Sequence, residues 1–272
     1  MMINGTYDIH EKKGEKLLEA MLARAKSSFS LVEAQGQLGL PKNLVVKILS
    51  TLRKKNKILL LSKGLYAFFP PAEKKFGFNV ARVLDPIMKH WQIPYYVGLL
   101  SAADYYGAAH YKPQILQVII PKKICFRKAK VLGISFHVQK IFPKTGLIRV
   151  KTPDGYVFYP TPALLVLDLL AYEKVSGGID TITLVIKEIM GHFKDKDLQK
   201  VALKYPVVAA VQKLGYILER VGAKSSLLIE LQDVLKRRGA SVIKLSSVLP
   251  KKGRFDPRWK IIKNTELEIN DI

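Results

Sequence analysis

The chain of 272 residues contains a single cysteine, Cys125, and no long apolar segment. A lone cysteine excludes an internal disulfide framework. Its apolar neighbours, Ile124 and Phe126, predict a thiol that is buried and inert rather than nucleophilic. No apolar run approaches the roughly 20 residues that cross a bilayer, and residues 1–10 lack the apolar core of a signal peptide. We therefore expect a cytoplasmic protein with no membrane span.

The sequence also lacks a catalytic or metal-binding pattern. Its five histidines never occur at a metal-ligand spacing; they are His10, His90, His110, His137 and His192. Residues 222–225 resemble the end of a phosphate-binding loop but lack its upstream glycine. Asp195 and Asp197 are better explained as the acidic first turn of a helix than as a cation site. We expect no catalytic residues, no metal and no cofactor, although a site assembled from distant residues would leave no such pattern.

Acidic residues are scarce. The chain has 45 lysines and arginines against 22 aspartates and glutamates, which gives a formal net charge of +23. Such a surplus attracts polyanions, of which nucleic acid and an anionic membrane surface are the main classes. A generally basic proteome or a need for solubility would give the same total, so the placement of the charge along the chain must decide.

Three helical patterns occupy the N-terminal part of the chain. Apolar residues recur at helical spacing within residues 11–26. Ser30 followed by Glu33 is the signature of a capping box, which predicts a second, short helix that stops at Gly39. Pro41 then predicts the start of a third helix, because a missing N–H does no harm in a first turn.

A hairpin pattern follows the third helix. The apolar runs 58–61 and 65–69 flank a short loop that contains Gly64, which predicts a β-hairpin with Lys63 at its tip. Two short helices, a basic helix and a hairpin in this order indicate a winged helix-turn-helix.

The third helix has one apolar face and one basic face. Its apolar stripe consists of Leu44, Val45, Ile48, Leu49 and Leu52. From Pro41 to Lys63 there are seven lysines or arginines and no acid. A solvated helix normally mixes both signs, whereas a surface that faces phosphates excludes carboxylates because they would repel DNA. The predicted DNA-contact residues are Lys42, Asn43, Lys47, Ser50, Arg53, Lys54, Lys55, Lys57 and Lys63.

These residues have two expected roles. Asn43 and Lys47 are predicted to reach base edges, because they lie in the N-terminal half of the helix that enters the major groove. Phosphate contacts are predicted for Arg53, Lys54, Lys55, Lys57 and Lys63. The alternatives are a unit that only dimerises or docks, and lysines that are ordinary solvated charges; the one-sided basic helix favours double-stranded DNA as the partner.

The remaining sequence predicts an α+β protein of two domains. Pro70, Pro71 and the polar residues up to Lys75 indicate a linker. We therefore expect a winged helix-turn-helix domain at residues 1–72 and a larger mixed α/β domain, mostly helical in its C-terminal half, at residues 73–272. The expected elements are helices at 81–90, 98–107 and 161–172, strands at 115–120 and 134–138, a hairpin that pairs 147–150 with 156–159, and mainly helices after residue 180.

A second acid-free stretch lies between Asp104 and Asp154. It contains a candidate second basic surface, formed by Lys122, Lys123, Arg127, Lys128 and Lys130. These cations either contact phosphate or protect exposed strand edges from aggregation, and both readings stay open. The interleaved aromatic residues are predicted to be core rather than stacking platforms; they are Tyr105, Tyr106, Tyr111, Phe126, Phe136 and Phe142.

A third basic cluster consists of Lys251, Lys252, Arg254, Arg258 and Lys260.

Several segments, in their order along the chain, resemble the AbiEi-type antitoxins, which are the transcriptional repressors of bacterial type IV toxin–antitoxin operons. The segments are residues 95–103, continuing through Gly107 into 115–121, then Gly177-Gly178, 215–219 and 259–264. The resemblance implies a winged helix joined to a larger α/β antitoxin domain, repression of its own operon, and a nucleotidyltransferase toxin encoded alongside.

Two other functions stay open from the sequence. One is a winged-helix regulator whose larger domain senses a small ligand, which would require a pocket with converging polar groups. The other is a nucleic-acid-processing enzyme, which would usually need clustered carboxylates to hold metal ions. The most basic stretch of the chain contains no carboxylate, which argues against the enzyme.

Overall fold

The protein is described by a computed structural model over residues 3–24, 26–68, 80–109, 111–125, 129, 132–152 and 155–268, with the backbone alone at residues 3–10, 152 and 155. The chain separates into two compact units. The first unit comprises Met1–Pro94, Cys125–Ile134 and Val150–Val157, and the second comprises Tyr95–Ile124, Ser135–Arg149 and Phe158–Ile272. The predicted linker and the boundary between residues 72 and 73 lie outside the described residues, so that boundary stays a prediction.

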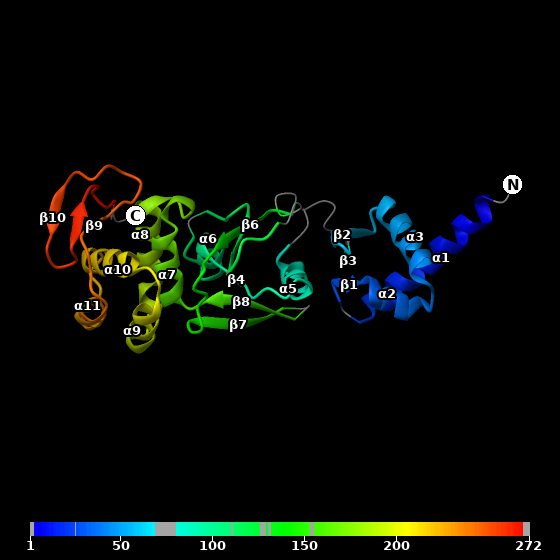
Figure 1. Ribbon diagram of the computed structural model, residues 1–272, viewed down its shortest axis with the longest axis horizontal. Helices are drawn as coiled ribbons and strands as arrows, with labels where there is room; N and C mark the ends of the chain where they lie inside the picture. The colour runs from blue at the N-terminus through cyan, green and yellow to red at the C-terminus, as the bar shows by residue number, and fades with distance from the viewer. Residues whose placement is uncertain are drawn as a thin grey trace. The chain divides into compact units, whose positions relative to one another are not determined.

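Helices and a small sheet alternate in the first unit (Figure 1). Its elements are α1 (Ile3–Leu22), β1 (Ser28–Ser30), α2 (Leu31–Leu38), α3 (Lys42–Lys54), β2 (Ile58–Ser62), β3 (Leu65–Phe68) and α5 (Ala81–His90). The strands form an antiparallel sheet in the order β1-β3-β2. The expected second and third helices, the hairpin and the helix at 81–90 are present.

Two details of the first unit differ from the sequence analysis. The first helix was expected at residues 11–26 but runs from Ile3 to Leu22, because helical backbone continues N-terminally beyond the apolar stripe. Strand β1 was not expected, since three residues are too few to show a period. It is held by its pairing with β3, where Phe29 lies opposite Tyr66.

The core of the first unit joins all three N-terminal helices to the sheet. Leu17 and Met21 of α1 are fully buried with Ile48 and Leu49 of α3. The Phe29 ring stacks on Tyr66 and tilts against Phe68, with centroids 5.7 and 5.2 Å apart. This packing fixes which face of α3 is left to solvent.

Small sheets and a short helix form the first half of the second unit. Strands β4 (Tyr96–Val97), β5 (Leu116–Ile120) and β6 (Ile134–Val138) make one sheet. Strand β7 (Leu147–Thr152) pairs with β8 (Gly155–Pro160), and Val150–Val157 of this hairpin are grouped with the first unit. Helix α6 (Leu99–Tyr105) packs beside β5. The predicted strands at 115–120 and 134–138 and the predicted hairpin are confirmed, and the fold class is α+β.

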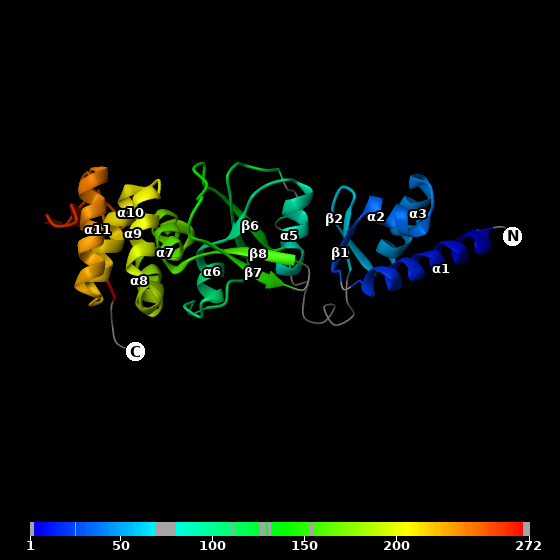
Figure 2. The ribbon, with the colours of Figure 1, turned by 90° about the horizontal axis from the view of Figure 1, so that it is seen from below.

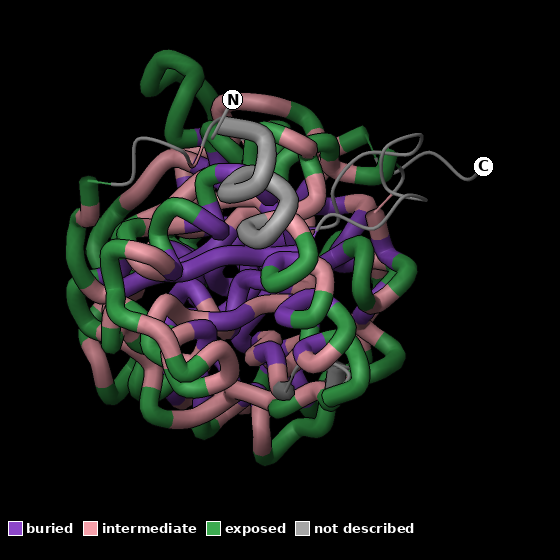
Figure 3. The backbone as a smooth tube through the Cα atoms, turned by 90° about the vertical axis from the view of Figure 1, so that its right-hand side faces the viewer, coloured by how far each residue is buried: buried purple, intermediate pink, exposed green. Residues whose placement is uncertain are grey.

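The second half of this unit is helical and ends in a third small sheet. The helices are α7 (Pro162–Ala171), α8 (Gly178–Ile189), α9 (Asp195–Lys204), α10 (Val208–Arg220) and α11 (Ser225–Arg238), with 3-10 turns η1 (Glu173–Val175) and η2 (Met190–His192). Figure 2 shows the five helices side by side. The sheet joins β11 (Ile261–Lys263) to β10 (Arg254–Asp256), antiparallel, and to β9 (Ile243–Lys244), parallel. Helix α7 is buried over most of its length. Figure 3 shows the buried segments of the chain in purple and the exposed segments in green.

A buried acid lies at the centre of the second unit. Asp168 of α7 accepts a hydrogen bond from the Tyr205 hydroxyl at 2.8 Å, and its other oxygen lies 2.9 Å from the Tyr96 hydroxyl. That hydroxyl is also 2.6 Å from Gln139 Oε1, and one hydrogen cannot serve both acceptors. Burial raises the pKa of Asp168 to about 7, against the two tyrosine hydrogen bonds, which lower it. A protonated Asp168 can donate to Tyr96 while Tyr96 donates to Gln139.

A second buried acid joins the C-terminal segment to the helices. Burial by itself would raise the pKa of Glu173, but hydrogen bonds from Lys213, Ser247 and Ser246 lower it to about 2. Lys213 Nζ lies 2.7 Å from the carboxylate, and both side chains are almost completely buried. Because each charge meets its partner, this pair ties α10 to η1, and the hydrogen bonds that Ser246 and Ser247 donate to Glu173 attach the residues that follow β9.

Candidate nucleic-acid interface

The exposed face of α3 gathers most of the predicted DNA-contact residues. Lys42, Asn43, Lys47, Ser50, Arg53 and Lys54 are all exposed, whereas Val45, Ile48, Leu49 and Leu52 on the other side are buried. Helical periodicity explains this separation, since residues three and four apart share a face. The exposed face carries four cations and no acid.

Local interactions fix the position of α3 after α2. Ser30 Oγ accepts from the Glu33 N–H at 3.1 Å, and the Glu33 carboxylate accepts from the Ser30 N–H at 2.7 Å, which completes the predicted capping box. Gly39 ends α2 with a φ of 62°, in the left-handed region that glycine adopts at least cost. Pro41 then stands at the N-cap of α3, one position before the helix that it was expected to open.

The first half of α3 exposes side chains that can contact a base, namely Asn43, Val46 and Lys47. Asn43 Oδ1 accepts from the Leu44 N–H at 2.9 Å, which orients the amide at the start of the helix. Val46, which the sequence analysis did not include among the contacts, is 43% exposed and lies between the two predicted base readers. A valine exposed on a basic helix offers an apolar contact of the kind that thymine methyl groups accept.

Lys55 and Lys57 are less exposed than the other predicted DNA-contact residues. Both are half-buried and form ion pairs with α1, Lys55 with Glu11 and Lys57 with Glu15. The sequence does not reveal these ion pairs, because the two partners are far apart along the chain. Lys57 and Glu15, for example, are about forty residues apart. In this structure the two lysines attach the end of α3 to α1, and their positive charge is balanced locally.

The turn of the hairpin is held by residues at the end of α5. Lys63 is exposed, and Gly64 takes a φ of 78° in the turn. The Lys63 carbonyl lies 3.1 Å from His90 Nε2, and Trp91 Nε1 donates to Ser62 Oγ at 3.2 Å. The end of α5 therefore holds the turn while leaving the Lys63 side chain in solvent.

Strand β3 of the hairpin lies close to a cation of α3. Burial raises the pKa of Tyr66 on β3, and the nearby Arg53 guanidinium opposes part of that rise. Arg53 therefore lies near Tyr66 of β3, and Lys54 follows it on α3.

The second basic surface is only partly described. Lys122 and Lys123 are exposed after β5, while Arg127, Lys128 and Lys130 lie outside the described residues. The expectation that Cys125 is buried is wrong, because this thiol is exposed. It follows the end of β5 in irregular chain, where apolar sequence neighbours do not imply burial.

The described aromatic residues of this stretch divide into two groups, and Phe126 lies outside the described residues. Tyr106 and Phe142 pack against the core, as expected, and Phe136 is partly buried. Tyr111 is 89% exposed and Tyr105 is 45% exposed, so the expectation of core positions is wrong for these two. Tyr105 nevertheless stacks on Tyr159, with centroids 4.2 Å apart.

Comparison with known proteins bears on the second unit first. Residues 96–220 match the family of the AbiEi antitoxin C-terminal domain. This segment is similar to the C-terminal domain of the AbiEi antitoxins, and we call it the AbiEi-type domain. The resemblance drawn from the sequence is thereby confirmed, and the AbiEi-type domain covers the stretch from β4 to the end of α10.

The whole fold also has a counterpart among solved structures. The crystal structure of the RV2827C protein from Mycobacterium tuberculosis is similar with a TM-score of 0.69, over 92% of this chain and 91% of that chain. The two sequences are 14% identical, so the likeness concerns the fold alone. No curated protein matches the chain in sequence.

Within the parts of the chain that the structure describes, no three His, Cys, Asp or Glu side chains form a group that could hold a metal ion. In the same parts, no helix is both long and apolar enough to cross a membrane.

Proposed function

We propose that this protein is a DNA-binding autorepressor and the antitoxin of a bacterial type IV toxin–antitoxin system, acting in the cytoplasm. Its partners would be double-stranded operator DNA and a nucleotidyltransferase toxin from the same operon. The AbiEi-type domain supports the antitoxin part of the proposal. The exposed face of α3 supports the DNA-binding part, and it is the single observation on which that part depends.

The proposed DNA-binding unit is a winged helix-turn-helix at residues 1–72. In this reading α2 and α3 are the helix-turn-helix, α3 enters the major groove, and the β2–β3 hairpin is the wing. Asn43 and Lys47 read base edges, and Val46 contacts a thymine methyl group. Lys42, Arg53, Lys54 and Lys63 neutralise phosphates, and Ser50 lies between the two groups.

Lys55 and Lys57 have a secondary role in this proposal. Exposed or half-exposed ion pairs are worth little, about 0–1 kcal/mol, so a phosphate could compete for either lysine. Their pairs with Glu11 and Glu15 favour a positioning role for α3 in the free protein. No catalytic step enters the proposal, whether or not the protein contacts the toxin directly.

Gel-shift titration of the full chain with a duplex from upstream of its own gene, and with a scrambled duplex, tests the DNA-binding part. Asn43→Ala and Lys47→Ala should each weaken operator binding by about 1–3 kcal/mol while changing binding to scrambled DNA less. Lys54→Ala should weaken both equally and reduce the slope of log affinity against log salt by about 0.9.

Lys16→Ala is the matched control. Lys16 is exposed on α1, with Glu15 just before it and Glu19 three residues after it, so it lies on a surface of mixed sign. The control removes the same charge from the same unit and should bind like the wild type. Operator binding that survives all three α3 substitutions, or that falls as far in Lys16→Ala, would contradict the proposed interface.

A further inference from the structure

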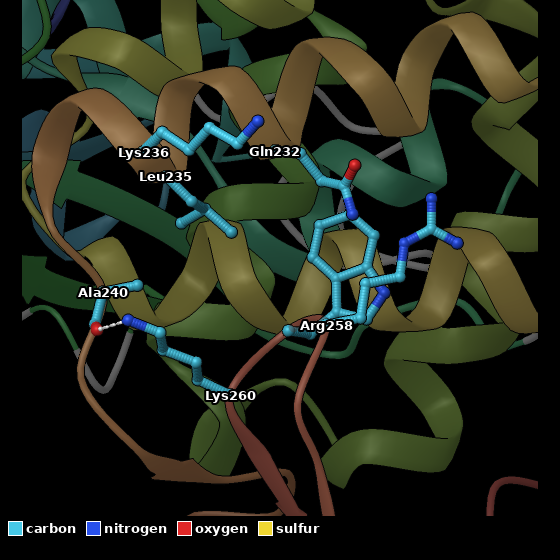
Figure 4. A pocket seen from close by; sticks show the side chains of 7 residues that line it. Gln232, Leu235, Lys236, Ala240, Arg258 and Lys260 are labelled. Atoms are coloured by element: carbon cyan, nitrogen blue, oxygen red, sulfur yellow. Dashed lines mark hydrogen bonds between the residues drawn. The ribbon is translucent and has the colours of Figure 1, made fainter.

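A pocket of about 340 Å³ lies in the C-terminal part of the second unit (Figure 4). Helix α11 contributes Gln232, Leu235 and Lys236 to its lining, and Ala240 follows the helix. The turn between β10 and β11 contributes Arg258, Trp259 and Lys260. We call this the C-terminal pocket. Its volume falls in the range of small-ligand sites, which begins at roughly 300 Å³.

The lining of the C-terminal pocket is positively charged. Three of its residues, Lys236, Arg258 and Lys260, are cations, and none is acidic. The surrounding sequence has the same bias, because residues 234–255 contain seven lysines or arginines and no acid. Figure 4 shows Lys236 and Lys260 on different sides of the pocket, so their charges approach it from two directions.

Two of the three cations are held in place. Arg258 pairs with Glu219 and lies over the Trp259 ring, with its Cζ 5.5 Å from the ring centroid. Lys260 donates to the Ala240 carbonyl at 2.9 Å. An arginine has five N–H donors, so the pairing with Glu219 leaves others for a ligand. Positioned cations are what a polyvalent anion requires, because little side-chain entropy is then lost on binding.

The remaining lining suits the non-ionic part of a ligand. Leu235 and Trp259 are almost completely buried, so they offer a ligand little surface, whereas the partly exposed Gln232 side chain carries both an amide donor and an acceptor. An amide can hydrogen-bond to the edge of a nucleobase, and clustered cations are what its phosphates need. We propose that the C-terminal pocket binds a nucleoside phosphate. This site is separate from the proposed DNA interface and does not depend on it.

The backbone at Lys260 gives a way to test the pocket with little disturbance. Lys260 has a φ of 53°, a conformation that glycine adopts more readily than lysine. Lys260→Gly therefore removes the cation without straining the turn. Lys236 is exposed on the last turn of α11, and no partner for it is found among the described residues, so Lys236→Ala removes charge and little packing.

Isothermal titration calorimetry of the full chain with ribonucleoside triphosphates is the direct measurement. We expect saturable binding at one site per chain, weaker binding of inorganic phosphate, and at least a tenfold loss of affinity in Lys236→Ala and in Lys260→Gly. Lys224→Ala is the matched control, because Lys224 is an exposed lysine at the opposite end of α11. It should bind like the wild type. Circular dichroism of each variant would show that the fold is kept.

Three outcomes would overturn the proposal. One is the absence of saturable binding at nucleotide concentrations of about 1 mM, which corresponds to a negligible affinity. Another is an equal loss in Lys224→Ala, which would show a diffuse response to net charge. The third is binding of a single-stranded oligonucleotide that depends on Lys236 and Lys260 while triphosphates do not bind, which would assign the pocket to the phosphates of a polymer.

Discussion

Replacing Gly215 by alanine should destabilise the second unit, although alanine is the better helix former. Gly215 lies within α10, and a Cβ added there would be 2.0 Å from Trp259 Cζ3 and 2.4 Å from two other indole carbons. Carbon atoms in contact are normally about 3.5–4.0 Å apart. The indole cannot swing aside, because Trp259 is fully buried and its Nε1 donates to Glu219 at 2.6 Å.

Two opposing effects set the size of the change. In a helix interior, alanine is favoured over glycine by roughly 0.5–1 kcal/mol. Overpacking a dense core costs about 1–3 kcal/mol, and an approach that is short by more than about 1 Å places this case at the upper end. We therefore expect the free energy of unfolding of the second unit to fall by about 2 kcal/mol.

Urea denaturation followed by circular dichroism would measure this loss. Gly36→Ala is the control, because Gly36 lies in α2, takes no positive φ, and has no heavy atom within 4 Å of an added Cβ. That substitution should stabilise the first unit by roughly 0.5–1 kcal/mol. If Gly215→Ala leaves the unfolding midpoint unchanged or raises it, the packing of Trp259 on α10 described above is wrong.

Two other predictions concern the buried acid and the separation of functions. Because burial raises the folded-state pKa of Asp168 to about 7, its contribution to stability is complete below its unfolded value of about 3.9 and is lost as pH rises to 7. Asp168→Asn should therefore remove a decline of up to about 1.4 kcal/mol per pH unit from urea titrations between pH 4 and 7; parallel wild-type and variant curves would contradict the assigned pKa. In cells, the full chain carrying Lys47→Ala and Lys54→Ala should fail to repress an operator–reporter fusion yet still rescue growth against the neighbouring toxin gene. Failure of the wild type to rescue growth would remove the antitoxin function.

Local signals predicted the N-terminal helices and the hairpin. The capping box of Ser30 and Glu33 and the left-handed Gly39 need only neighbouring residues, and both were found where the sequence placed them. The same is true of α5, whose bounds match the predicted range 81–90. The two faces of α3 followed directly from its period, so most of the candidate interface could be predicted.

Features that depend on distant residues left no signal in the sequence. The short strands β9 and β10 are stabilised by β11, and none has enough residues to show a pattern. The pairing of Lys57 with Glu15 joins α3 to α1, so a lysine predicted to contact phosphate already has a partner. The C-terminal pocket likewise joins α11 to the β10–β11 turn, and its sequence signal was only a cluster of charges.

The exposure of Cys125 has a practical consequence for work with the purified protein. It is the only cysteine in the chain and it is in contact with solvent, so air oxidation can link two chains through one intermolecular disulfide. A dimer seen without reductant would then be covalent and would say nothing about self-association. The same thiol accepts a single maleimide dye without any engineered cysteine, so the wild-type chain carries its own labelling position two residues beyond Lys123.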